Sequence, residues 1–368
     1  MSRKLKIVSP AGTPASLRAA LRAGADAVYL GLRDTTNARN FPGLNFSTDE
    51  LAAGVALAHE QGAKVLLAVN TYMRASNPAP WFRAVDIGAD CGVDAVILAD
   101  TGLLDYAARR HPDLRRHLSV QASAATPEAI RFYTEQFGVK RVVLPRVLTV
   151  TDIADLISKV NVETEVFAFG GLCVMAEGRC ALSGHVTGAS PNCAGVCSPA
   201  SHARFETSDR QTRFSLGDVT LDIVPDNEAR GYPTPCKGRY LIGGEPTCAF
   251  AEPGSLNVLP ILPDLAAAGV TAVKIEGRQR GRAYVEVVTR AFRRAVDALA
   301  DGQPLPEGLQ GDMTEGRQRG RAYVEVVTRA FRRAVDALAD GQPIPEGLQG
   351  DMTEGGRTTG GSYERGWR

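Results

Sequence analysis

Long hydrophobic runs and a surplus of charge are both missing from this sequence of 368 residues. The formal net charge of +1 gives no overall attraction to nucleic acid or to an anionic membrane, so any binding to a polyanion would have to be local. The N-terminal run M-S-R-K-L-K-I-V-S-P-A-G has only a short apolar stretch before Pro10 and Gly12. We therefore expect neither a signal peptide nor a membrane span, and a cytoplasmic location.

Several catalytic and cofactor motifs are also missing. No G-x-G-x-x-G follows the first apolar segment, which removes the main reason to expect a dinucleotide-binding sheet. Neither a Ser/His/Asp order nor H-E-x-x-H occurs, so the common peptidase chemistries are not indicated. The cysteines form no C-x2-C pair of the kind that structural zinc sites use, and no C-x3-C-x2-C motif of a radical-SAM site.

A short apolar run, in most copies preceded by an Ala-rich helical stretch and a glycine, recurs along the chain. Continuous apolar strands that alternate with helices indicate a parallel sheet covered on its outside. Eight of them predict an α/β fold, a (β/α)8 TIM-like barrel, with a doubly wound open sheet as the alternative. The eight runs begin at Lys6, Gly24, Gly62, Gly92, Leu118, Gly138, Glu165 and Gly269.

Polar residues at the ends of these strands should face one common mouth of the barrel, where catalytic groups normally lie. For each of them the alternative is a structural cap or turn contact. The residues are Asn70, Asp100, Gln121, Ser123, Arg146 and Glu276.

A long cysteine-bearing insertion should separate strands 7 and 8. The seventh strand ends near Leu172 and the eighth begins near Ala272, a separation far longer than an ordinary connection. We expect residues 1–172 to hold the first seven β/α units, 173–268 to form a subdomain over the mouth, and 269–314 to supply the last strand and closing helix. Within the insertion, R-F-E-T-S-D-R-Q-T-R-F-S-L is expected to form a surface hairpin.

The segment 276–314 recurs as 315–353 with a single change, Leu305 to Ile344. Repeat architectures need several diverged units, whereas this is one nearly perfect copy. We expect the first copy to close the barrel, the second to be a surplus amphipathic helix and 354–368 to be a tail. The clustered arginines of both copies are expected mainly on a solvated face.

Six of the seven cysteines lie between Cys173 and Cys248, and only Cys91 lies outside that stretch. Cys173, Cys180, Cys197 and Cys236 have the spacing C-x6-C-x16-C-x38-C. Dispersed thiolates around glycine-rich loops suit a [4Fe-4S] cluster. The spacing leaves zinc, inert buried thiols and a nucleophilic cysteine open as alternatives.

The run E-V-F-A-F-G-G-L-C-V-M-A-E-G-R-C-A-L-S resembles the signature of the collagenase-like "peptidase" family of unassigned catalytic type, with Gly171 where Ala or Ser is usual. Other motifs are similar to a ubiquinone-biosynthesis branch of that family. They are S-P-A-G at Ser9, D-T-T-N-A-R-N-F-P-G-L-N-F at Asp34, Q-A-S-A at Gln121, V-V-L-P-R-V-L at Val142, G-Y-P-T-P-C-K-G-R-Y-L at Gly231 and V-K-I-E-G-R-Q-R at Val273.

The resemblance implies an iron-sulfur protein that acts with a paralogous partner as a heterodimer. The implied reaction is the hydroxylation of the aromatic ring of a ubiquinone precursor without dioxygen. It also implies a [4Fe-4S] cluster held by Cys173, Cys180, Cys197 and Cys236, with Cys193 as an alternative to Cys197. Relatives hydroxylate RNA bases, with prephenate as a proposed oxygen source, so a small oxygen-donating acid is expected here as well.

These expectations suggest roles for several side chains near the mouth. Arg146 or Arg179 is a candidate to bind a carboxylate of the oxygen donor, because the guanidinium fork pairs with carboxylate bidentately. Asp100, Glu177 and Glu276 are candidates for proton transfer. RNA-base hydroxylation, with arginines contacting phosphates, and peptidase activity are the alternative functions.

Overall fold

The computed structural model describes residues 4–41, 43–171, 173, 175–208, 210–225, 234–250, 255–311 and 313. Within them, eight parallel strands close into a barrel, because β6 pairs with both β5 and β7, and β14 pairs with both β7 and β1. The predicted TIM-like barrel is therefore confirmed. Its strands are β1 (Lys6–Pro10), β2 (Ala27–Leu30), β3 (Lys64–Val69), β4 (Ala95–Leu98), β5 (Arg115–Leu118), β6 (Arg141–Val143), β7 (Glu163–Gly171) and β14 (Ala272–Ile275).

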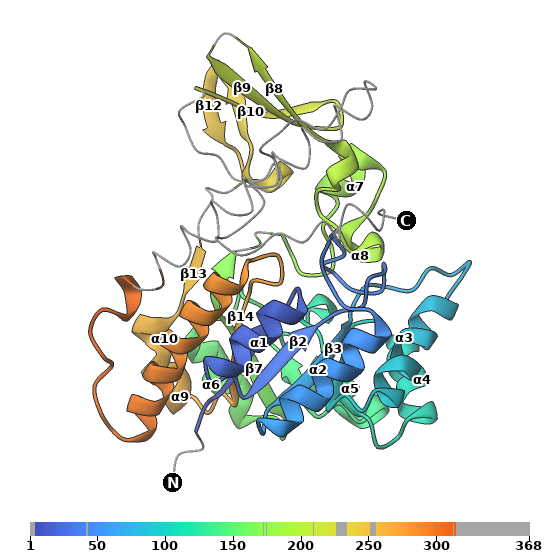
Figure 1. Ribbon diagram of the computed structural model, residues 1–368, viewed down its shortest axis with the longest axis vertical. Helices are drawn as coiled ribbons and strands as arrows, with labels where there is room; N and C mark the ends of the chain where they lie inside the picture. Colours follow the sequence, from blue (N-terminus) through green and yellow to red (C-terminus); the bar gives the residue numbers. More distant parts are fainter. Residues whose placement is uncertain are drawn as a thin grey trace.

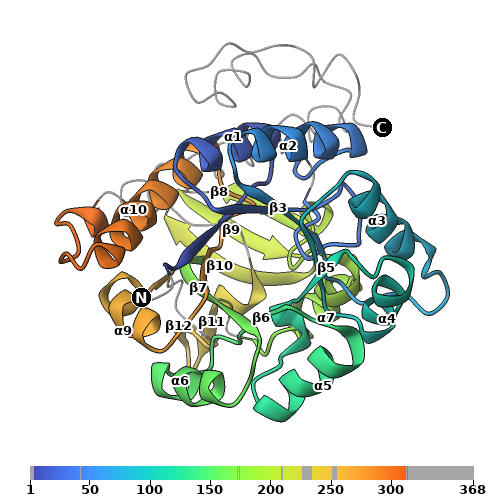
Figure 2. The ribbon, with the colours of Figure 1, turned by 90° about the horizontal axis from the view of Figure 1, so that it is seen from below.

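A ring of helices covers the outside of the barrel (Figure 2). Their apolar faces and the outward side chains of the strands form the main hydrophobic core. The ring comprises α1 (Pro14–Arg22), α2 (Thr48–Glu60), α3 (Ala79–Asp90), α4 (Thr101–Arg110), α5 (Pro127–Phe137), α6 (Val150–Ser158), α9 (Leu262–Ala267) and α10 (Arg282–Ala300). Capping boxes begin α2, from Ser47 and Glu50, and α6, from Thr149 and Asp152.

The first copy of the duplicated segment supplies α10. This helix packs on α1 and β1 and buries Tyr284, Val288 and Phe292. Ser9 on β1 shares a hydrogen bond with Thr289 on α10, at 2.9 Å between their hydroxyl oxygens. The second copy, 315–353, lies outside the described residues.

The fifth strand differs from the expectation. We predicted it from Leu118 onward, but β5 ends at Leu118, and Val120–Ala122 form a single 3₁₀ turn, η1. The strand itself, R-R-H-L, begins with two arginines. It was missed because Arg115 takes part in an ion pair with Glu163 and Arg116 donates to four carbonyl groups, so charge replaces the usual apolar signal.

The interior of the barrel is lined largely by small apolar residues. Ala27, Ala68, Ala95 and Ala272 belong to the inner cluster, together with Val8, Tyr29, Leu66 and Ile97. Small side chains leave room inside a closed barrel that bulkier ones would fill. That room is taken by charged groups and by a cavity at the carboxyl ends of the strands.

The segment between β7 and β14 stands over that end of the barrel (Figure 1). It contains α7 (Leu182–Thr187), α8 (Pro191–Ala194), a three-stranded antiparallel sheet and the pair β11 (Arg239–Ile242) and β12 (Glu245–Cys248). The three-stranded sheet consists of β8 (Ala203–Ser208), β9 (Gln211–Leu216) and β10 (Val219–Pro225), and its first two strands are the predicted hairpin. Short 3₁₀ turns are η2 (Ala200–His202), η3 (Pro235–Lys237) and η4 (Leu259–Ile261).

The returning chain adds one antiparallel strand to the barrel. β13 (Ser255–Asn257) pairs with the last residues of β7, from Phe169 to Gly171. The helix α9 then joins the outer ring. No helix in the described parts of the chain is both long and apolar enough to cross a membrane.

Candidate functional site

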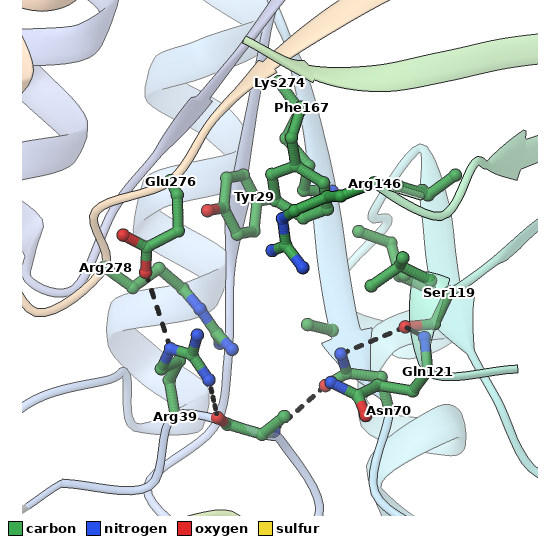
Figure 3. A pocket seen from close by; sticks show the side chains of 15 residues that line it. Tyr29, Arg39, Asn70, Ser119, Gln121, Arg146, Phe167, Lys274, Glu276 and Arg278 are labelled. Atoms are coloured by element: carbon green, nitrogen blue, oxygen red, sulfur yellow. Dashed lines mark hydrogen bonds and ion pairs between the residues drawn. The ribbon is translucent and has the colours of Figure 1, made fainter. Parts of the chain in front are cut away.

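A cavity of about 60 Å³ lies at the mouth, the end of the barrel where its strands finish. Two aromatic rings, Tyr29 and Phe167, form part of its wall (Figure 3). Four of the six polar strand-end residues predicted to face the mouth line it: Asn70, Gln121, Arg146 and Glu276. The remaining charged lining residues are Arg39, Lys274 and Arg278.

The other predicted strand-end residues have structural contacts. Asp100 is the N-cap of α4 and accepts hydrogen bonds from the backbone N–H groups of Leu103, at 3.1 Å, and Met73, at 3.2 Å. Ser123 ends η1 with a positive φ of 55°. Arg179 is exposed and does not line the cavity.

Three of the four cationic side chains in the cavity wall are paired with carboxylates. Lys274 Nζ lies 2.8 Å from Glu165 Oε1, and both groups are buried. Arg146 Nη1 lies 3.2 Å from Oε1 of Glu177, a residue of the cysteine-bearing segment. Arg39 Nε lies 3.6 Å from Glu276 Oε1. Each of these cations is thus held in place by an acidic neighbour.

Arg278 is the exception among the cationic lining residues. Its Nη1 donates to Asn37 Oδ1 at 3.1 Å, and its guanidinium lies 5.6 Å from the centre of the Tyr29 ring. Its buried Nε has no hydrogen-bond partner within the described residues. Burial lowers the pKa of Arg278 to about 10, so the side chain is still charged at neutral pH.

A row of neutral hydrogen-bonding groups forms another part of the wall. Asn70 Oδ1 accepts from the backbone N–H of Ala38 at 3.0 Å, and Asn70 Nδ2 donates to Ser119 Oγ at 3.2 Å. The same hydroxyl accepts from the backbone N–H of Gln121 at 3.2 Å. These bonds fix Asn70 and the backbone of Gln121 on the wall opposite Glu276 (Figure 3).

Four cysteine thiols influence one another electrostatically. Burial raises the pKa of the Cys197 thiol; Cys236, Cys173 and Cys180 raise it further, and Arg39 lowers it. Burial likewise raises the pKa of Cys236, with further increases from Cys173 and Cys180. These are the four thiols that the sequence grouped together, and all cysteines of the chain are free.

Cys193 and Cys248 lie in other settings. Cys193 belongs to α8, and it is one of several groups that raise the pKa of Tyr72, after burial and Tyr133. Cys248 ends β12, where it is paired in register with Arg239 of β11.

Arg39 lies between the thiols and the cavity. Burial lowers its pKa, but Glu276 on one side and the thiols of Cys197 and Cys173 on the other hold the pKa above its ordinary value. The same loop of the barrel also contacts the cysteine-bearing segment, since Asn40 donates its backbone N–H to the carbonyl of Gly195 at 3.0 Å. The thiols and the cavity are therefore neighbouring parts of one region.

The thiol set can be tested against the metal groups considered from the sequence. Among the described residues, no three His, Cys, Asp or Glu side chains form a group that could hold one metal ion. Zinc would need tetrahedral ligands about 2.3 Å from a single centre. A four-iron cluster takes one cysteine on each iron and so spaces its ligand sulfurs farther apart. The four thiols, which act on one another electrostatically, have the ligand chemistry that such a cluster needs.

The lining residues that were not predicted as functional include Tyr29, Arg39, Lys274 and Arg278. Lys274 and Tyr29 lie within strands whose apolar neighbours dominate the pattern. Arg278 was grouped with the arginines of a solvated helix face, yet it precedes α10 and is 3% exposed. The sequence feature that could have identified Arg278 is its position two residues after Glu276, in the loop that follows the last strand.

Comparisons with known proteins point to one family. Residues 12–314 match the profile of peptidase family U32. The chain is 29% identical over 299 residues to tRNA hydroxylation protein P1 of Bacillus subtilis, covering 81% of this chain and 64% of that protein. It is 30% identical over 326 residues to tRNA hydroxylation protein P of Escherichia coli, covering 83% and 71%.

A third relative acts on ribosomal RNA according to its name. The chain is 30% identical over 303 residues to the 23S rRNA 5-hydroxycytidine C2501 synthase of Escherichia coli, covering 82% of this chain and 40% of that enzyme. The chain thus spans between 40% and 71% of the length of these three relatives.

Proposed function

Because the chain belongs to peptidase family U32, whose relatives described above are named for hydroxylation, we propose that it takes part in a hydroxylation reaction that uses no dioxygen. The observation that carries this proposal is the proximity of four cysteine thiols to a polar cavity at the barrel mouth. A redox group beside a small-ligand cavity is the arrangement that such a reaction requires. In this proposal the chain is an enzyme or the essential subunit of one.

The proposed cofactor is a [4Fe-4S] cluster held by Cys173, Cys180, Cys197 and Cys236. When bound, the cluster would supply electron transfer or activation of an oxygen donor beside the cavity. The electrostatic influence of Cys173 and Cys180 on both Cys197 and Cys236 supports this ligand set, because it places the four thiols near one another, and a bound metal centre would deprotonate them.

The chain's own residues would bind and orient the small acid that donates oxygen, with prephenate as one candidate. The cationic wall of the cavity attracts a carboxylate, and Glu177 fixes the direction of Arg146. Glu276 accepts a hydrogen bond from the backbone N–H of Gly171 at 3.2 Å and reaches the cavity, so it could exchange a proton with a bound ligand. Asp100 and Arg179 lie outside the cavity wall, which favours supporting roles for both.

We propose the aromatic ring of a ubiquinone precursor as the substrate. The support is the ordered set of motifs from Ser9 to Val273 that resembles the ubiquinone biosynthesis protein UbiU. This assignment includes a UbiV-like paralogue as the partner in a heterodimer. The second candidate is an RNA base, which the printed names of the relatives favour.

Anaerobic production of the chain with and without a UbiV-like partner tests these proposals. We expect four iron and four sulfide per chain and ring hydroxylation of the precursor only with the partner present. The Cys173→Ala variant should lose iron and activity, whereas Cys248→Ala is the matched control that keeps both. Absence of iron, together with activity retained in Cys173→Ala, would refute the cluster proposal.

A strain that lacks the gene for this chain separates the two substrates. Its quinone precursors and the hydroxylated bases of its tRNA and rRNA can be measured by mass spectrometry after anaerobic growth. Accumulation of an unhydroxylated precursor with normal RNA supports the ubiquinone assignment. Loss of hydroxylated bases with normal quinones supports the RNA assignment instead. Proteolysis that survives the removal of iron would indicate a peptidase.

A further inference from the structure

Arg278 is the one cation of the cavity wall that no ion pair among the described residues joins to a carboxylate. Arg39, Arg146, Lys274 and Arg278 line the cavity, and the carboxylates of Glu276, Glu177 and Glu165 pair with the first three. No carboxylate in the described part of the chain pairs with Arg278. A buried charge without a counter-charge is costly, and proteins normally pair it.

Arg278 is also held firmly in its position. Its Nη1 bonds to Asn37, and an added Cβ at Gly31 would lie only 2.6 Å from that nitrogen and 2.7 Å from Asn37 Cγ. Its own carbonyl oxygen would lie 1.8 Å from a Cβ at Gly12. The chain therefore places glycines where larger residues would displace this arginine. A fixed cation with a free N–H donor is a preorganised binding group.

The guanidinium of Arg278 points toward the same space as that of Arg39, as Figure 3 shows. After burial, the charge of Arg39 is one of the causes that lower the pKa of Arg278, so the two cations lie close together. They share the single carboxylate of Glu276 in the cavity wall. An anion placed between them would relieve this repulsion and satisfy the free Nε.

We propose that Arg278 binds the carboxylate of a small organic acid in this cavity. The carboxylate would supply the counter-charge that Arg278 lacks in an ion pair among the described residues. A planar carboxylate matches the guanidinium fork, which can offer it two parallel hydrogen bonds. The side chains of Asn70 and Gln121 would meet polar groups of the ligand, and the rings of Tyr29 and Phe167 would contact its carbon skeleton.

The size of the cavity limits the part of the ligand that it encloses. A volume of about 60 Å³ accommodates roughly four to six water molecules, at about 10–15 Å³ each. A carboxylate with a short chain fits that space, and a larger acid would extend through the mouth toward the thiols. Identification of this ligand as the oxygen donor rests on the proposed function, whereas its binding can be measured independently.

Calorimetric titration of pyruvate into the full-length, anaerobically purified chain tests the proposal. Methyl pyruvate, which has the same skeleton without the charge, and inorganic phosphate are the comparison ligands. We expect saturable pyruvate binding that exceeds the binding of both comparison ligands by about tenfold or more, the effect of a hydrogen-bonded charge. Absence of pyruvate binding, or tighter binding of phosphate, would overturn the proposal.

Three variants connect the binding to Arg278. Arg278→Met removes the charge and should weaken pyruvate binding by about tenfold to a hundredfold. Arg278→Lys keeps the charge without the fork and should give an intermediate loss. Arg290→Gln is the matched control, because Arg290 is an exposed arginine of α10 that pairs with Glu286. Its affinity should equal that of the unaltered chain.

Undiminished affinity in Arg278→Met would refute the role of this arginine. If circular dichroism shows that Arg278→Met is unfolded, Arg278→Lys decides, and full affinity in that variant contradicts bidentate binding. Iron content and hydroxylation are measured on the same preparations. Normal hydroxylation without pyruvate binding would refute this inference alone, and pyruvate binding without hydroxylation would refute the proposed function alone.

Discussion

Arg146 and Glu177 join the end of the sixth barrel strand to the cysteine-bearing segment. Both the backbone N–H and the Nη1 of Arg146 donate to Oε1 of Glu177, each at 3.2 Å. The guanidinium also lies 4.0 Å from the centre of the Phe167 ring. Since Glu177 falls between Cys173 and Cys180 in the chain, this contact holds part of the proposed ligand loop against the cavity wall.

Replacement of Glu177 by Ala should destabilise the protein strongly. The substitution leaves the guanidinium of Arg146, only 11% exposed, without its carboxylate, and breaking a buried pair in this way costs about 3–5 kcal/mol. Glu128→Ala is the control, because it removes an exposed pair with Arg131 that is worth at most about 1 kcal/mol. Urea denaturation measures both, and equal losses would contradict a special role for the Arg146–Glu177 pair.

The stability of the barrel should fall in acid because of Glu165. Burial alone would raise the pKa of this carboxyl group, but Lys274 and Arg141 hold it below its usual value. The stabilisation is therefore present above the unfolded pKa of about 4.3 and is lost as the pH falls through the lower folded value. Unfolding free energies measured between about pH 6 and pH 3 should show a shallower slope in Glu165→Gln, together with lower stability at pH 7. Identical slopes would refute this assignment.

Cys193 and Cys197 should differ in their effect on iron content. Cys197→Ser should lower iron and sulfide in anaerobically purified protein, because the thiol of Cys197 is the one influenced by Cys236, Cys173 and Cys180. Cys193→Ser should keep the content of the unaltered chain. Chemical iron and sulfide determination and the visible absorption spectrum report the outcome, and the reverse result would exchange the two ligands.

A methyl group at Gly195 should separate the cysteine-bearing segment from the barrel. An added Cβ there would lie 2.1 Å from the carbonyl oxygen of Asn37, and the backbone has a φ of +78°. Gly188 is a matched control with a φ of +70° and no atom within 4 Å of an added Cβ. Both Ala variants bear the left-handed cost of about 1–2 kcal/mol, but only Gly195→Ala should also lose iron. Equal iron content in the two variants would show that this contact is dispensable.

Deletion of residues 315–353 should leave the fold and the iron content unchanged. The barrel is already closed by β14, which precedes the repeated segment, and α10 of the first copy packs against β1 and α1. Thermal unfolding and iron analysis of the shortened chain provide the measurement. A marked fall in either would assign a structural task to the second copy.

The barrel was predictable because most of its strands are apolar on both faces. Ala95–Leu98, for example, is buried throughout, and a fully buried parallel strand has no polar alternation to obscure it. The position of β5 was not predictable from this pattern, because Arg115 and His117 occupy inward positions: Arg115 pairs with Glu163 of β7 and donates to His117 within the strand. Whether a charged segment of this kind forms a strand depends on its contacts with distant parts of the chain.

The sequence predicted only those cavity-lining residues that directly follow the ends of strands. Asn70, Gln121, Arg146 and Glu276 met that rule. Arg39 lies in the loop after β2, and two hydrogen bonds fix its backbone there. The Nδ2 of Asn45 donates to the carbonyl of Arg39, and the backbone N–H of Arg39 donates to Oδ1 of Asn37. Local sequence carries no signal for such a loop conformation.

The pairing of β13 with β7 has a consequence for the history of the chain. The segment over the mouth departs after Gly171 and returns at Ser255, and these two residues are partners in the same antiparallel pairing. The two ends of the segment therefore lie next to each other at the mouth of the barrel. A gene rearrangement that exchanged the segment between them would leave the hydrogen bonding of the barrel intact, so one scaffold could acquire different inserted modules by a single exchange.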